Sequence, residues 1–192
     1  MMRNFIIILL ISTQAMAQES LPFFSIPAVP EQVTTATTLA RMIQGLGFRY
    51  HWATEGLRAE DLSYRPSPEG QSALETLQHI YGLALVIHNT TLSQANLSPL
   101  ANIPNDIKSL RSSTLELLKK ASKNFIQASE EDIVKMQVIF DRHGKESSFP
   151  IWNLMNGPIE DLVYHTGQIV SFRRTTGNPI PKGVNVFMGT KN

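Results

Sequence analysis

The residues best suited to chemistry in this sequence are an aspartate and a histidine near its C-terminal end. Asp161 and His165 are four positions apart. In a helix this spacing places both side chains on one face, one turn apart, and Gln168 follows three positions later on the same face. A carboxylate oxygen and an imidazole nitrogen so placed can bind one divalent metal ion together. The spacing therefore predicts two ligands of a metal site.

A third ligand has to come from another helix, and His79 is the best candidate. It lies in the middle of an apolar helical pattern, so its side chain is expected to point partly into a helical bundle. Two histidines and one aspartate leave coordination positions open for water or substrate, as a catalytic metal requires. A structural metal would need a fourth protein ligand, for which His51, Glu75 and Glu160 are the candidates.

The same residues are also compatible with roles other than metal binding. An aspartate and a histidine four positions apart can form an ordinary surface pair, and a single helical histidine often belongs to a packed core. Glu75 could orient His79 or act as a base, but its spacing from Ser72 favours helix capping. Gln168 could bind a metal-bound water or tie helices together. Glu75 and Gln168 are thus weak catalytic candidates, and no catalytic residue is assigned.

The remaining histidines are poorer candidates for metal binding. His88 follows His79 by nine positions, which places it on nearly the opposite side of the same helix. His143 belongs to an expected turn. His51 lies near the end of the first helix, where a positive charge favours the helix dipole, and it serves only as a reserve ligand. Arg173 and Arg174 could meet an anionic substrate, although cations in a last helical turn commonly serve the dipole.

Four helical segments are expected to position these residues. Apolar residues recur at three- and four-residue steps in segments 34–57, 72–88, 107–125 and about 150–174. Ser72 and Glu75 have the spacing of a capping box, and Asn105 is the expected cap of the third helix. Asn156-Gly157-Pro158 interrupts the last segment, so that helix is expected to kink or begin there.

Between residues 136 and 149 the pattern changes from helical to alternating. Val138 and Phe140 alternate with polar neighbours, residues 141–144 resemble a turn, and residues 147–149 could return as a second strand. We therefore predict an all-α fold, a four-helix bundle with a small β-hairpin insert before the last helix. The bundle is expected to span 34–178, between an extended lead-in at 18–33 and an extended tail at 179–192.

Residues 1–17 have the pattern of a secretory signal peptide. Arg3 precedes an apolar run from Phe5 to Ile11, and Ala15-Met16-Ala17 supplies the small residues at a cleavage site. A buried helix or membrane anchor is the alternative, but a span needs about 20 apolar residues. We expect an exported protein, periplasmic or secreted, with no membrane span and a formal charge of zero after cleavage.

Length and composition narrow the class of protein further. A chain of 192 residues, 42% hydrophobic and 17% charged, is expected to form one globular domain. The formal charge of +1 gives no electrostatic reason to expect nucleic acid as a partner. Because the sequence has no cysteine, disulfides, thiolate zinc sites and catalytic thiols are excluded, and a metal must be held by His, Asp, Glu or water.

Two short segments resemble the signature regions of the DinB-like (YfiT-like) metalloenzyme superfamily. They are Leu-Glu-Thr-Leu-Gln-His-Ile at 74–80 and Tyr-His-Thr-Gly-Gln-Ile at 164–169, and the resemblance covers most of 34–178. It implies a four-helix bundle, often a homodimer, with a divalent metal in the bundle core. The family commonly has histidine where this chain has Asp161. Zinc, manganese, iron and nickel are candidates, and the carboxylate favours the first three.

We therefore expect a divalent-metal-dependent enzyme, a hydrolase or transferase acting on a small substrate. Relatives in this superfamily include thiol transferases and hydrolases, so the resemblance implies one of these two classes. Export disfavours a thiol transferase, because low-molecular-weight thiols are cytosolic. The alternative is a non-catalytic binding or stress-related helical bundle with a structural metal or none.

Overall fold

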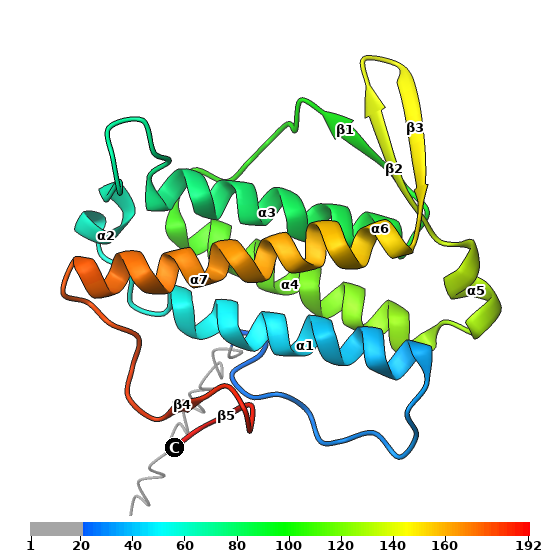
Figure 1. The fold of residues 1–192 in the computed structure, drawn as a ribbon, viewed down its shortest axis with the longest axis horizontal. Coiled ribbons are helices and arrows are strands. Elements are labelled where there is room, and N and C mark those ends of the chain that lie inside the picture. The colour runs from blue at the N-terminus through cyan, green and yellow to red at the C-terminus, as the bar shows by residue number, and fades with distance from the viewer. Residues whose placement is uncertain (1–20) are drawn as a thin grey trace, which may run out of the picture.

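The structure is a computed structural model that describes residues 21–192, and it is a four-helix bundle (Figure 1). The bundle consists of α1 (Thr35–Thr54), α3 (Ala73–Thr90), α4 (Ile107–Gln127) and α7 (Glu160–Thr175). This confirms the predicted fold class. The signal peptide predicted at 1–17 lies outside the described residues. Within the described part of the chain, no helix is long and apolar enough to cross a membrane.

The four helices form two parallel pairs that run in opposite directions. Arg173, in the last turn of α7, donates to the carbonyl of Ala53 in the last turn of α1, so these two helices are parallel. Asn124, near the end of α4, donates to Thr91 just after α3, which makes the second parallel pair. A long connection therefore has to return along α3 before α4 begins, and it contains β1 (Ala95–Ser98).

Side-chain caps determine where the helices begin. Ser72 Oγ accepts from the Glu75 amide, and the Glu75 carboxylate accepts from the Ser72 amide at 2.7 Å, which confirms the predicted capping box of α3. The cap predicted for α4 is wrong by one residue. Asp106, not Asn105, accepts from the Ser109 amide at 2.9 Å, because a carboxylate at this position stabilises the free amides of the first turn.

The core lies between the four helices and is built from their apolar stripes. In α7 the buried positions recur at four, three and four residues, and they are Leu162, Thr166, Ile169 and Arg173. Asp161, His165 and Gln168 each lie one residue before a buried position. A step of one residue turns the side chain by about 100° around the helix axis. These three residues therefore form a second stripe at the edge of the core.

A π-helical turn introduces α7. Short α6 (Trp152–Leu154) is followed by a π-helix, Met155–Ile159, and then by α7. Pro158 lies inside the π-helix, where its missing amide hydrogen interrupts regular α-helical hydrogen bonding. The predicted interruption at 156–158 is thus confirmed. The π-helix lies directly before the residues of the second stripe of α7.

The predicted hairpin is formed by β2 (Gln137–Arg142) and β3 (Lys145–Pro150). Its turn contains His143 and Gly144, both with positive φ. The sequence did not indicate the third strand, β1, which pairs in parallel with β2 from Ala95 opposite Ile139 to Ser98 opposite Arg142. The insert is therefore a three-stranded sheet of order β1-β2-β3 rather than a hairpin alone.

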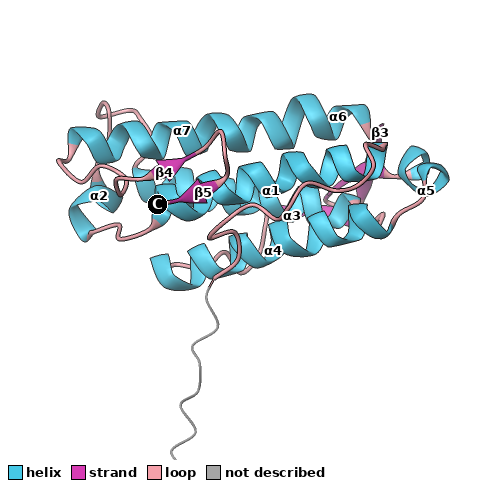
Figure 2. Cartoon of the chain, turned by 90° about the horizontal axis from the view of Figure 1, so that it is seen from below, coloured by secondary structure: helices cyan, strands magenta, loops and turns pink. Residues whose placement is uncertain are grey.

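Several short elements complete the fold. They are α2 (Ala59–Ser63), α5 (Glu130–Lys135), β4 (Val184–Asn185) and β5 (Thr190–Lys191). Figure 2 shows the β4–β5 hairpin lying against the bundle beside α1. The Ile26 amide donates to the Gly189 carbonyl at 2.8 Å, and Lys191 Nζ lies 5.7 Å from the centre of the Trp52 ring. The C-terminal segment thus packs on the lead-in and on α1.

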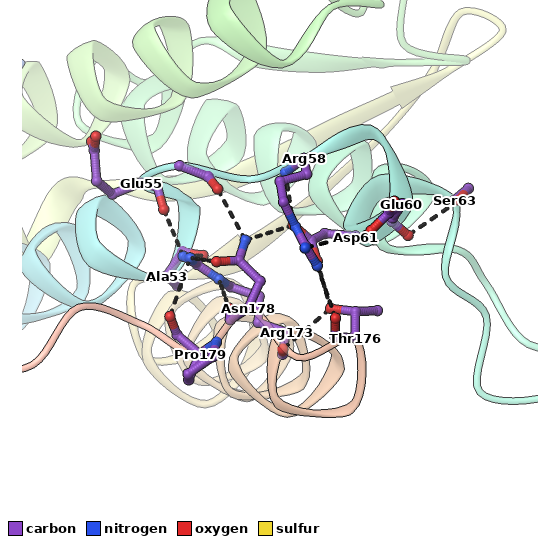
Figure 3. A network of polar contacts seen from close by, with 11 residues as sticks. Ala53, Glu55, Arg58, Glu60, Asp61, Ser63, Arg173, Thr176, Asn178 and Pro179 are labelled. Atoms are coloured by element: carbon purple, nitrogen blue, oxygen red, sulfur yellow. Dashed lines mark hydrogen bonds and ion pairs between the residues drawn. The ribbon is translucent and has the colours of Figure 1, made fainter.

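Arg173 ties the C-terminal ends of α1 and α7 together (Figure 3). Its side chain is buried, and Nη1 donates to the carbonyls of Ala53 at 3.1 Å and Glu55 at 2.7 Å, while Nε donates to the Asn178 carbonyl at 2.7 Å. The last carbonyls of a helix have no partner within it. Arg173 therefore caps α1, and the suggestion that it meets a substrate is wrong.

Asp61 extends this network from α2 (Figure 3). Its buried carboxylate accepts from the Arg58 guanidinium at 3.0 and 3.1 Å, from Asn178 Nδ2 at 2.6 Å and from the Thr176 hydroxyl. These hydrogen bonds, those of Arg58 first, hold the pKa of Asp61 well below its ordinary value. The carboxylate thus stays ionised and joins α2 to the residues that follow α7.

We predict that Arg173→Met lowers the free energy of unfolding by about 2–4 kcal/mol, because it leaves buried carbonyls without donors. Arg174→Met is the matched control, since Arg174 is the exposed neighbour. It should change stability by about 0.5 kcal/mol or less. Urea unfolding followed by circular dichroism measures both. Equal losses in the two variants would contradict the capping role.

A second prediction concerns how the stability contributed by Asp61 depends on pH. Because the pKa of Asp61 is lower in the folded than in the unfolded chain, Asp61 stabilises the fold above its unfolded pKa of about 3.9. That contribution decreases as the pH falls below about 5. We expect Asp61→Asn to be less stable than wild type at pH 7, with a smaller difference at pH 3.5. A difference independent of pH in urea titrations would refute this assignment.

Candidate metal centre

The structure brings His79 of α3 together with Asp161 and His165 of α7. Asp161 Oδ2 lies 3.2 Å from His79 Nε2, and Asp161 Oδ1 lies 3.2 Å from His165 Nε2. The two imidazole rings are nearly perpendicular, with centroids 4.7 Å apart. One potential ligand atom from each residue lies within 4.8 Å of the other two. Among the described residues, no other group of His, Asp and Glu side chains has this geometry.

The group lies at the surface edge of the α3–α7 contact. The side chains of His79 and Asp161 are 43% and 42% exposed, whereas that of His165 is 17% exposed. The resemblance implied a metal in the bundle core, and this detail is wrong. The reason is the second stripe of α7, which is turned away from the buried one. Solvent and small molecules can therefore reach these side chains directly.

Gln168 orients His165. Its Oε1 lies 2.7 Å from His165 Nδ1. Because an amide oxygen can only accept, this contact favours a proton on Nδ1, and a neutral ring in this tautomer has its lone pair on Nε2. That nitrogen faces Asp161. Gln168 therefore acts within α7 by holding the ring in the tautomer that a metal needs, and it does not tie two helices together.

None of the three candidates for a fourth ligand, Glu75, Glu160 and His51, belongs to the group around Asp161. Glu75 is engaged by Ser72 and by the Arg65 guanidinium, and these hydrogen bonds, that of the Ser72 amide first, lower the pKa of Glu75 to about 2. Glu160 lines a depression beside α1, with Arg49. His51 Nδ1 lies 2.8 Å from the Pro22 carbonyl. The group around Asp161 thus offers three potential protein ligands among the described residues.

The other three histidines, His51, His88 and His143, lie away from the candidate metal group. His51 is buried, and burial lowers its pKa, so its expected role as a cation at the end of α1 is wrong. Burial also lowers the pKa of the half-buried His88. His143 is exposed in the hairpin turn. None of the three belongs to the group around Asp161.

A cleft of about 440 Å³ lies next to the group. His79 lines it together with residues of α3, β1, β2 and the segment after β1. Sequence reasoning missed this feature because β1 was not predicted, and without β1 no wall faces α3. The signal that could have revealed it is weak, since Ala95–Ser98 alternates apolar and polar residues over only four positions, and the structure buries Asn96 while leaving Leu97 exposed.

The comparisons with known proteins show the fold. Neither a protein-family model nor a curated protein sequence matches the chain. Among solved structures, the DinB-like protein YjoA of Bacillus subtilis is 19% identical, with a TM-score of 0.55 over 75% of this chain and 95% of that chain. A DinB-like protein of Bacillus cereus is 16% identical, with a TM-score of 0.53 over 73% and 94%. The chain therefore has a DinB-like fold, as the two signature segments indicated.

We predict that Gln168→Leu weakens zinc binding by about 10- to 100-fold, because His165 loses the acceptor that fixes its tautomer. Gln127→Leu, at the exposed end of α4, is the matched control and should bind zinc as the wild type does. Competition with a chromogenic zinc chelator measures both affinities. If the two variants bind zinc equally well, Gln168 has no orienting role.

Proposed function

We propose that this protein is a divalent-metal-dependent enzyme acting on a small substrate, with the metal held by His79, Asp161 and His165. The observation that carries the proposal is the convergence of three ligand atoms, within 4.8 Å of one another, from two separate helices. The DinB-like fold supports it. Zinc, manganese, iron and nickel all accept two imidazoles and one carboxylate, and the carboxylate favours the first three.

The contact between His165 and Asp161 supports the fit of a cation. Gln168 Oε1 lies beside His165 Nδ1, and the other ring nitrogen, Nε2, faces a carboxylate oxygen of Asp161 at 3.2 Å. Either a proton on Nε2, which makes the ring an imidazolium, or a metal ion bound by both atoms satisfies a contact at this distance. A divalent ion ligated by Nε2 and by the carboxylate satisfies both groups, and His79 Nε2 faces the other carboxylate oxygen.

The number and exposure of the ligands favour catalysis over a structural role. A bound divalent ion would supply Lewis acidity, lowering the pKa of a water or a substrate thiol so that it becomes a nucleophile at neutral pH. His79, Asp161 and His165 leave coordination positions free, whereas structural sites are closed by a fourth protein ligand. The exposed side of His79 and Asp161 gives a substrate access.

Hydrolysis is the reaction that we favour over thiol transfer. The sequence of residues 1–17 favours export, to the periplasm or outside the cell. Low-molecular-weight thiols are cytosolic, so an exported enzyme would have poor access to them, whereas water is available everywhere. We therefore propose an exported hydrolase of a small substrate.

Elemental analysis of untagged protein tests metal binding. We expect about one equivalent of a divalent transition metal in wild type, and less than about a tenth in His79→Ala and His165→Ala, since each removes a ligand. His88→Ala is the matched control on α3 and should keep the metal. Wild type that stays below about a tenth of an equivalent after reloading would refute the site. Full occupancy in His79→Ala would exclude that residue as a ligand.

Ester hydrolysis tests catalysis. We expect zinc- or manganese-loaded protein to hydrolyse p-nitrophenyl acetate about 10-fold or more faster than chelator-treated protein, and this gain should disappear in His165→Ala. Release of nitrophenolate is followed by absorbance. A rate that is the same with and without bound metal would favour the non-catalytic alternative, a binding bundle with a structural metal.

A further inference from the structure

The three-stranded sheet and the segment after β1 lie on the α3 side of the bundle (Figure 1). Residues of β1, β2 and this segment line a cleft together with His79 and other residues of α3. Its volume of about 440 Å³ lies within the range of about 300–1,000 Å³ typical of sites for small organic molecules. Most of its lining is apolar, and the side chains include Leu83 and Val86 from α3, Leu97, Leu100 and Ile103 from the opposite wall, and Phe140 from β2. Such a lining favours the apolar part of a ligand.

Gly82 keeps the floor of this cleft open. It follows His79 by three residues, so both lie on the same face of α3. A Cβ atom at this position would have Leu100 Cδ2 as its neighbour at 3.6 Å, an ordinary contact. The space above Gly82 thus accepts a methyl group, but a leucine side chain would extend across the cleft. Because Gly82 and His79 are adjacent on this face, a ligand in the cleft lies next to the candidate metal centre.

The cleft has a single permanently charged residue in its lining, and that residue is positive. Its lining contains Arg142 but no aspartate or glutamate. Within the described part of the chain, no carboxylate lies within ion-pair distance of Arg142, and its partner across the hairpin is Lys145. The neighbouring Asp141 accepts from the Gly144 amide at 2.7 Å and so belongs to the turn. An arginine without an acidic partner attracts a carboxylate or a phosphate.

We propose that this cleft binds small amphipathic anions, molecules with one apolar chain or ring and a single carboxylate or phosphate. The apolar part lies over Gly82 and Leu83, and the anionic group is bound by Arg142. The inference rests on the proposed function, because it names the class of substrate that the metal held by His79 would act on. It does not need the metal to be present for binding itself.

Calorimetric titration with decanoate and with decyl phosphate, in zinc-loaded and chelator-treated protein, tests the assignment. We expect saturable one-to-one binding to wild type, weakened about 10-fold or more by Gly82→Leu but about threefold or less by Gly82→Ala. Leu100→Trp fills the cleft from the other wall and should act like Gly82→Leu without changing a helix. Arg142→Gln should weaken the binding of both anions about two- to fivefold and leave that of decanol unchanged.

Zinc stoichiometry, measured on the same samples, separates this inference from the proposed function. None of the substituted residues is a ligand, so every variant should bind zinc as wild type does. The cleft assignment is overturned if wild type binds neither anion, or if Gly82→Leu and Leu100→Trp bind both as well as Gly82→Ala does. If the anions bind as expected but neither wild type nor any variant takes up zinc, the proposed function fails and the cleft assignment stands.

Discussion

The packing of α7 against both α1 and α3 is the constraint on which the candidate site depends. The helix has to bury one stripe, Leu162, Thr166, Ile169 and Arg173, and at the same time present Asp161 and His165 to His79 of α3. A rotation of α7 by one residue, about 100°, would bury the aspartate and remove both ligands from His79. The rotational position of α7 therefore determines whether the three candidate ligands come together at all.

Both ends of α7 hold this position. At the C-terminal end, Arg173 and Asp61 place two opposite charges inside the protein, and their hydrogen bonds to α1, α2 and the residues after α7 offset the cost of removing them from water. At the N-terminal end, the π-helix changes the phase of the helix just before Asp161. The polar network in Figure 3 thus supports the site from a distance without touching it.

The sequence predicted those features that depend on local spacing. Apolar periodicity indicated the four helices, the capping box marked the start of α3, and the four-residue step from Asp161 to His165 put both on one face. Most features that depend on distant contacts were not predictable. His79 was an exception, because its place in a helical pattern and the family resemblance pointed to it. Ala95–Ser98 becomes a strand only because β2 lies beside it. From the sequence alone, Arg173 is an ordinary cation in the last turn of a helix. Its capping role depends on the carbonyls of Ala53 and Glu55, which only the folded structure brings to it. The surface position of the site and the cleft likewise follow from packing.

The most direct test of the central claim is a crystal structure of the zinc-loaded protein with anomalous diffraction measured at the zinc edge. The account predicts one anomalous peak per chain between α3 and α7, at about 2.0–2.2 Å from the Nε2 atoms of His79 and His165 and from a carboxylate oxygen of Asp161. Density for water or substrate should complete the coordination. A zinc-loaded crystal with no peak at these three residues, or with the ion bound elsewhere, would contradict it.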